Sequence, residues 1–176
     1  MANQLRDRFF LGPRQTPTQD LKFTVNQLVE IAVRALSPGI NDPFTAMNCL
    51  DYLGAALCQL ARKDFPSPYR CDDGGDLRVV ACVPTFSDLA DTAFDLIRRY
   101  GRTSAPVLVK MMEVIETVLT MASREEDRAA LRRHALLVLR CGEMLSEEER
   151  ADVEDQSRRL SQVPEGRTTA TRDAGA

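Results

Sequence analysis

One corner of the sequence, residues 34–46, gathers side chains that could bind a ligand. It reads RALSPGINDPFTA and joins two apolar segments. Its polar residues continue into the second segment at steps of three and four, which places them along one side of a helix. An arginine near the free N–H groups of a helix start can hold an anion. The candidate ligand-binding residues are Arg34, Ser37, Asn41, Asp42, Thr45, Asn48 and Tyr52.

The same corner also has a purely structural interpretation. Asn41 or Asp42 can cap the second helix, and Pro43 suits its first turn because that position needs no N–H donor. Pro38 ends the helix before the corner, and Gly39 favours a turn. We expect capping to be the main role of these residues, with ligand binding as the alternative. The two interpretations differ in what the polar stripe contacts.

Residues suited to catalysis or metal binding are sparse elsewhere. The single histidine, His134, directly follows two arginines in the run LRRHALLVL, and we expect it at the surface or at its boundary. The run DDGGD lacks the ligand spacing of a calcium loop and favours a hairpin turn. We expect no catalytic residues, no metal and no cofactor. The alternative is a hydrolytic domain built on the corner from residue 34 to residue 48.

Composition limits the class of protein. The chain has 176 residues, of which 44% are apolar, and a formal net charge of −3. This predicts one domain and argues against a nucleic-acid partner, because no basic footprint covers the domain. The five cysteines form no C-x-x-C pair, so we expect reduced core thiols. No apolar run approaches the roughly 20 residues of a transmembrane helix, so we expect no transmembrane segment.

Helical periodicity runs through most of the chain. Apolar residues recur at steps of three and four from Asp20 to the corner, and again from the corner to about Lys63. In the second helix we expect Gly54 to mark close approach to another helix. The expected buried face of that helix is Phe44, Met47, Leu50, Gly54, Leu57 and Leu60.

Cap signals predict the remaining helices. Thr85 and Ser104 stand at two starts, and the pairs Ser123 with Glu126 and Ser146 with Glu149 fit capping boxes.

Between the second and third helices, residues 69–71 and 77–83 could pair as a hairpin, which we expect to lie against the helices. The fold class is therefore all-α, a bundle of about five or six helices with one small β-hairpin. We expect an N-terminal arm at residues 1–17, one helical domain at 18–162 and a disordered tail at 163–176.

Residues 27–53, QLVEIAVRALSPGINDPFTAMNCLDYL, resemble the DUF2254 family of predicted bacterial membrane proteins. The entry PRQTPTQDLKF, the PTF after the hairpin and the run LIRRYG extend the resemblance. It implies transmembrane helices in an N-terminal part, followed by a soluble part to which this chain would correspond. It implies no catalytic residues. We expect a cytoplasmic chain, or one attached to the cytosolic side of a membrane if the family's N-terminal part is present.

These patterns favour a function in interaction rather than in catalysis. We expect a cytosol-facing interaction or regulatory module, with a protein partner or self-association. The alternative is a domain that binds a small ligand at the corner.

Overall fold

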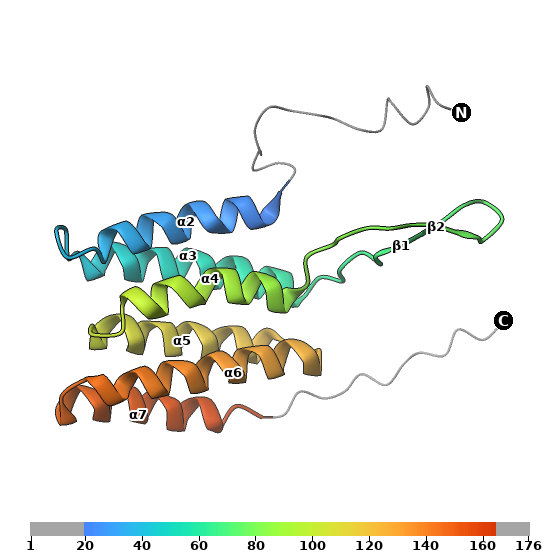
Figure 1. Ribbon diagram of the computed structural model, residues 1–176. Helices are drawn as coiled ribbons and strands as arrows, with labels where there is room; N and C mark the ends of the chain where they lie inside the picture. The colour runs from blue at the N-terminus through green and yellow to red at the C-terminus, as the bar shows by residue number, and fades with distance from the viewer. Residues whose placement is uncertain (1–19, 165–176) are drawn as a thin grey trace.

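The computed structural model describes residues 20–164, which form six α-helices, one short 3-10 helix and a two-stranded hairpin (Figure 1). This confirms the helical bundle and the hairpin between its second and third helices. In chain order the elements are α2 (Leu21–Ala35), α3 (Pro43–Ala61), β1 (Tyr69–Cys71), β2 (Leu77–Val80), α4 (Phe86–Tyr100), α5 (Ala105–Met121), α6 (Glu125–Cys141), η1 (Gly142–Met144) and α7 (Glu147–Ser161). The predicted N-terminal arm and most of the predicted tail lie outside the described residues.

The helices stack in two layers. One layer holds α2, α4 and α6, and the other holds α3, α5 and α7, with α5 packed against α3, α6 and α7. Successive helices run in opposite directions (Figure 1). The carboxyl ends of α3, α5 and α7 lie at one end of the bundle, which we call the hairpin end. We call the opposite end, which carries the turn from α2 to α3, the corner end.

Side-chain caps start several of these helices. Asp20 caps α2 by accepting a hydrogen bond from the Phe23 N–H, and both Thr85 and Ser146 form capping boxes. The predicted box at Ser123 is wrong. Arg124 holds the N-cap position of α6 and makes no side-chain cap there. Its guanidinium pairs with Asp127. The helix begins at Glu125, one residue later than the box requires.

The core of α3 confirms part of the predicted face. Leu50, Gly54 and Leu57 are buried, and a Cβ atom at Gly54 would lie 2.7 Å from Val114 Cγ1 of α5. This confirms the close approach of two helices at Gly54. Phe44, however, is 73% exposed, so its predicted burial is wrong. At 3.6 residues per turn, Phe44 lies about 120° around the helix from Leu50, away from the core.

The hairpin does not lie against the helices as expected. Tyr69 pairs with Val80 and Cys71 pairs with Leu77, and every strand residue is exposed. The hairpin projects from the end of the bundle (Figure 1). Pro66, Pro68 and Pro84 flank the two strands; proline favours extended backbone in the residue before it, so the connections carry the strands away before they pair.

Candidate functional site

The turn from α2 to α3 is closed by its own backbone. The N–H of Asp42 donates to the carbonyl of Ala35 at 2.8 Å, and the N–H of Asn41 donates to the carbonyl of Ser37 at 2.9 Å. Asn41 has a φ of 48°. Asparagine tolerates this left-handed conformation better than most residues do. The left-handed residue of the turn is therefore Asn41, and the predicted turn residue Gly39 keeps a negative φ.

Asp42 is the N-cap of α3. Its carboxylate accepts hydrogen bonds from the Thr45 N–H at 3.1 Å and from the Thr45 hydroxyl at 2.6 Å. These bonds, the hydroxyl first, lower the pKa of the Asp42 carboxyl. Of the two residues that the sequence offered as caps, Asp42 takes the role. Asp42 and Thr45 are thus brought together, and Thr45 donates two hydrogen bonds to the Asp42 carboxylate.

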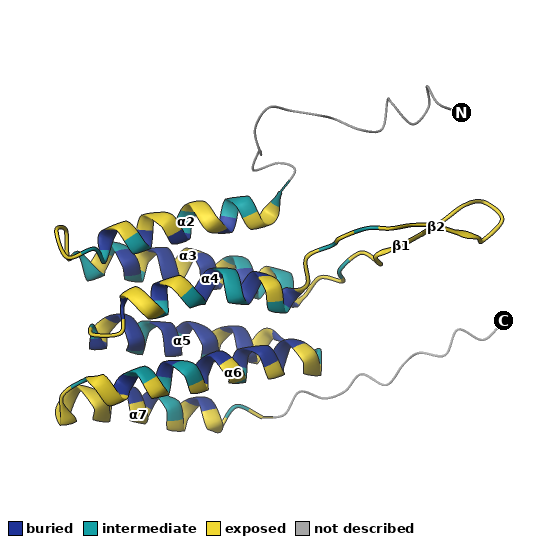
Figure 2. Ribbon diagram, viewed as in Figure 1, coloured by how far each residue is buried: buried dark blue, intermediate teal, exposed yellow. Residues whose placement is uncertain are grey.

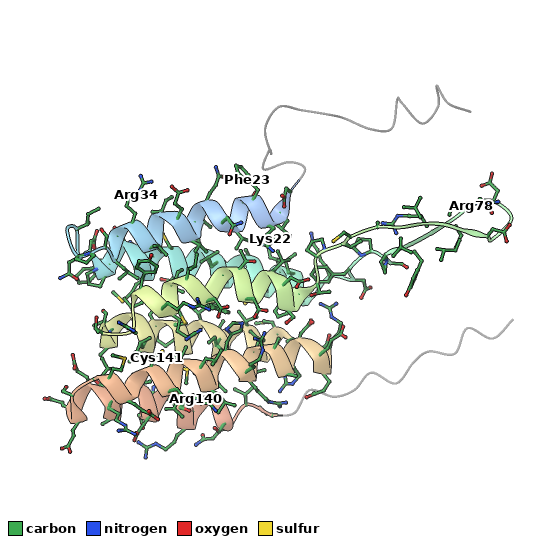
Figure 3. The ribbon with its side chains drawn as sticks, viewed as in Figure 1. Lys22, Phe23, Arg34, Arg78, Arg140 and Cys141 are labelled. Atoms are coloured by element: carbon green, nitrogen blue, oxygen red, sulfur yellow. The ribbon has the colours of Figure 1, made fainter. Side chains whose placement is uncertain are left out.

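The other two polar residues before the turn are engaged within α2. Arg34 pairs with Glu30 at 2.8 Å and projects away from the bundle (Figure 3). The Ser37 hydroxyl donates to the carbonyl of Arg34 at 2.7 Å. Neither side chain contacts the start of α3 through a hydrogen bond. An anion held jointly by Arg34 and the α3 N-terminus would require Arg34 to leave Glu30.

The polar stripe continues along the exposed side of α3. Asn48 and Tyr52 are both exposed, and Phe44 lies one turn before Asn48 on the same side. Ile40, in the turn, is also exposed. The four residues Ile40, Phe44, Asn48 and Tyr52 form what we call the corner face. The sequence-based prediction left out the two apolar members of this face. It assigned Phe44 to the core and gave Ile40 no role. The four-residue spacing of Phe44, Asn48 and Tyr52 was the available signal.

His134 is fully buried, which contradicts its predicted place at the surface or boundary. Its Nε2 lies 2.7 Å from Asp91 Oδ1, and its ring packs edge-on against Phe94. Burial lowers the pKa of His134, while the pair with Asp91 acts in the opposite direction. The two preceding arginines suggested an exposed residue. Arg133 and His134 both contact Asp91 Oδ1, but the Arg133 side chain is exposed and the imidazole is buried.

The His134 environment does not form a nucleophile-activating pair. Asp91 occupies Nε2, and the buried Nδ1 has no hydrogen-bond partner among residues 20–164. The nearby hydroxyl of Ser87 accepts a bond from Arg133 at 3.4 Å. A serine nucleophile needs its hydroxyl bonded to a nitrogen of the base. In the described part of the chain, the imidazole therefore has a packing and hydrogen-bonding role.

A cluster of polar side chains connects three helix ends at the hairpin end. The Arg124 guanidinium donates to the carbonyl of Lys63 at 2.7 Å and pairs with the buried Asp127 at 2.6 Å. Burial raises the pKa of the Asp127 carboxyl, and Arg124 acts against that effect. Arg128, also buried, donates to the carbonyls of Leu119 and Ala122. The cluster joins the start of α6 to the ends of α3 and α5.

The prediction that all the cysteines are core thiols is wrong. All five are free thiols, but only Cys49 is buried, and Cys71 and Cys82 are exposed on and beside the hairpin. Within residues 20–164, no three His, Cys, Asp or Glu side chains cluster as metal ligands. None of the helices in the same part of the chain has the length and apolar content needed to span a bilayer.

Comparisons with known proteins confirm the family resemblance. A family model described as "Predicted membrane protein (DUF2254)" matches residues 1–117. Uncharacterised proteins of Mycobacterium bovis and Mycobacterium tuberculosis are 32% identical to the chain over 157 residues. The alignment covers 88% of this chain but 30% of each relative, so the chain spans less than a third of their length. No solved structure matches the chain.

Proposed function

The chain belongs to the DUF2254 family of predicted membrane proteins, and we propose that it is a cytosol-facing interaction module of such a membrane protein system. One observation carries the proposal. The β1–β2 hairpin stands clear of its own bundle and is exposed along its whole length (Figure 2). The proposed occupant of this hairpin is the hairpin of a second copy of the chain.

Both faces of the hairpin carry apolar side chains. Because side chains alternate along a strand, Leu77 and Val79 share one face, and Val80 lies on the other with its cross-strand partner Tyr69. The exposed fractions of these four side chains are between 53% and 63%. A lone two-stranded hairpin is marginally stable in water. A partner that covers both faces and a strand edge would stabilise it.

The charges along the hairpin favour a second copy as that partner. Its turn carries Asp72, Asp73 and Asp76. Asp72 and Asp76 pair with Arg78, which Figure 3 labels on the hairpin. At its root, Arg62 and Lys63 have no ion-pair partner within residues 20–164. Asp64 beside them lies 3.8 Å from Arg124.

Two hairpins related by a two-fold axis perpendicular to their strands would run antiparallel. The acidic turn of each would then lie beside the basic root of the other. Such an arrangement also offers each apolar face an identical apolar face. The exposed free thiols Cys71 and Cys82 fit the reducing cytosol, where such groups stay unpaired.

Sedimentation velocity over a concentration series tests self-pairing. We expect the wild type to be a dimer and Val79→Lys to be a monomer at the same concentrations, because the lysine places a charge on the paired face. The matched control is Leu136→Lys, which changes an equally exposed apolar residue on α6 and should leave the dimer intact. Far-ultraviolet circular dichroism should be the same for all three proteins.

Two outcomes would count against the hairpin dimer. One is a wild type that stays monomeric at every concentration. The other is a dimer that Val79→Lys and Leu136→Lys weaken equally, which would place the contact elsewhere.

A small-ligand site at the corner face is the second candidate function. It is supported by the amide of Asn48 between two exposed rings, Phe44 and Tyr52, an arrangement that could stack and hydrogen-bond a planar ligand. A thermal-shift screen of metabolites and nucleotides tests it, with Asn48→Ala and Tyr52→Ala as the variants. We expect a true ligand to raise the melting temperature of the wild type only. A flat screen, or an unchanged shift in both variants, would remove this candidate.

A further inference from the structure

Arginines from two helices and a loop converge on one cavity at the corner end. The cavity has a volume of about 340 Å³ and lies between the carboxyl ends of α4 and α6. Arg98 and Arg99 come from the last turn of α4, Arg102 from the loop after it, and Arg140 from the last turn of α6. Figure 3 labels Arg140 beside Cys141, where α6 passes into η1. We propose that this cavity binds a phosphate-bearing anion.

The cavity holds an excess of positive charge. In residues 20–164, five arginines have no ion pair, namely Arg62, Arg70, Arg99, Arg102 and Arg140, and three of these five line the cavity. The other ten arginines of the same region pair with a carboxylate, so unpaired guanidinium groups are concentrated here. The nearest acid on α4, Asp95, is already paired with Arg98 at 3.1 Å. Like charges that share a cavity repel one another, and a bound anion relieves that repulsion.

Arg98 is held in place but incompletely bonded. Its Nη2 donates to Asp95, its Nη1 lies 3.7 Å from Cys141 Sγ, and its side chain is 13% exposed. The Nε of Arg98 is buried and has no partner among residues 20–164. A buried donor without an acceptor is unfavourable. The contacts with Asp95 and Cys141 thus fix the Arg98 guanidinium at the cavity wall.

A role in the helix dipole accounts for only part of this arrangement. Cations near a helix C-terminus offset its negative end, and this explains why Arg98, Arg99 and Arg140 stand where they do. It does not explain Arg102, which lies outside any helix. It also does not require side chains of two helices and a loop to meet at one cavity. Anion binding accounts for both features.

Phosphate suits the site better than a carboxylate does. Guanidinium groups bind phosphate through paired N–H donors, and three uncompensated cations match a phosphate dianion more closely than a monoanion. Leu137 and Met144 supply apolar wall beside the arginines. This wall would contact the organic part of a phosphate ester. The ester could be a dissolved metabolite or the headgroup of an anionic phospholipid, and the two sources share the same contacts.

Isothermal titration calorimetry with inorganic phosphate tests the site, with chloride at equal ionic strength as the reference. We expect Arg99→Gln, Arg102→Gln and Arg140→Gln each to weaken phosphate binding by about tenfold, since each removes a charge-assisted hydrogen bond. The matched control is Arg158→Gln. It removes the same charge from an exposed arginine in the last turn of α7, at the hairpin end, and it should bind phosphate like the wild type.

Vesicle flotation separates the two sources. Binding to vesicles of phosphatidylcholine with phosphatidylglycerol, but not to phosphatidylcholine alone, and its loss in Arg102→Gln would identify a lipid headgroup. Phosphate binding in solution without vesicle binding would identify a dissolved phosphate ester. The proposal is overturned if neither probe binds, or if Arg158→Gln weakens binding as much as the three cavity variants do.

Discussion

At the scale of single residues, burial decides what His134 can do. Its imidazole is enclosed against Phe94 and bonded to Asp91, and burial lowers its pKa. The native ring therefore stays neutral at pH values where an exposed histidine takes up a proton. In the unfolded chain the pKa returns to about 6.5. As the pH falls below that value, the unfolded state binds a proton that the native state does not, and stability is lost.

This linkage can be measured because the chain has one histidine. We expect the urea midpoint of the wild type to fall between about pH 7.5 and about pH 5.5. The variant His134→Gln should be less stable at the higher pH, because it disturbs the Asp91 bond and the packing against Phe94. Its midpoint should vary much less over the same range. A variant that retains the full pH dependence would assign the titration to another group.

The corner illustrates the same point for a predicted site. Asp42 and Thr45 meet as expected of a cap, whereas Arg34 pairs within its own helix. Residue type and spacing predicted the cap because all its partners lie within three positions. They did not place Phe44, whose exposure depends on where the other helices pack.

At the scale of elements, α3 and α5 pack closely together at Gly54. A Cβ atom there would lie 2.7 Å from Val114 Cγ1, and valine on a helix has little freedom to move aside. The glycine therefore fits the packing even though glycine weakens a helix. The glycine predicted a close helix contact from the sequence, but it could not identify α5 as the partner.

We expect Gly54→Ala to lower the free energy of unfolding by about 1–2 kcal/mol through overpacking. This should hold although alanine favours a helix by about 1 kcal/mol over glycine. In a chain that also carries Val114→Ala, the contact is absent and Gly54→Ala should instead be stabilising. Chemical denaturation of the four proteins of this cycle measures the change of sign. Gly39→Ala, where a Cβ atom meets nothing within 4 Å, is the control. An effect of the same sign in both backgrounds would refute the steric account.

At the scale of the whole molecule, Arg128 joins segments that lie far apart in the sequence. From α6 its guanidinium donates to the carbonyls of Leu119 and Ala122 at the end of α5. It also donates to the carbonyl of Pro164, beyond the end of α7, at 2.7 Å. One buried side chain thus donates to three backbone carbonyls at the hairpin end.

We expect Arg128→Met to lower the free energy of unfolding by about 2–4 kcal/mol, because buried carbonyls lose their donors. Arg128→Lys should restore little of this, since an ammonium group lacks the planar fork that reaches several acceptors. The control is Arg132→Met on the same helix, which breaks a more exposed pair with Glu125 and should cost less than about 1 kcal/mol. Equal losses in the Arg128→Met and Arg132→Met variants would show that the three carbonyls do not need this donor.

Local interactions allowed the sequence by itself to determine the elements of this protein. The apolar period, the caps at Asp42, Thr85 and Ser146, and the hairpin turn all involve residues a few positions apart, and the structure confirms them. Tertiary structure alone decided which surfaces those elements present. His134 and Asp91 are 43 positions apart, and Arg128 and Pro164 are 36 apart. Burial depends on such distant partners. For this reason the inward turn of His134, the exposure of Phe44, the projecting hairpin and the convergence of four arginines appear only in the folded chain.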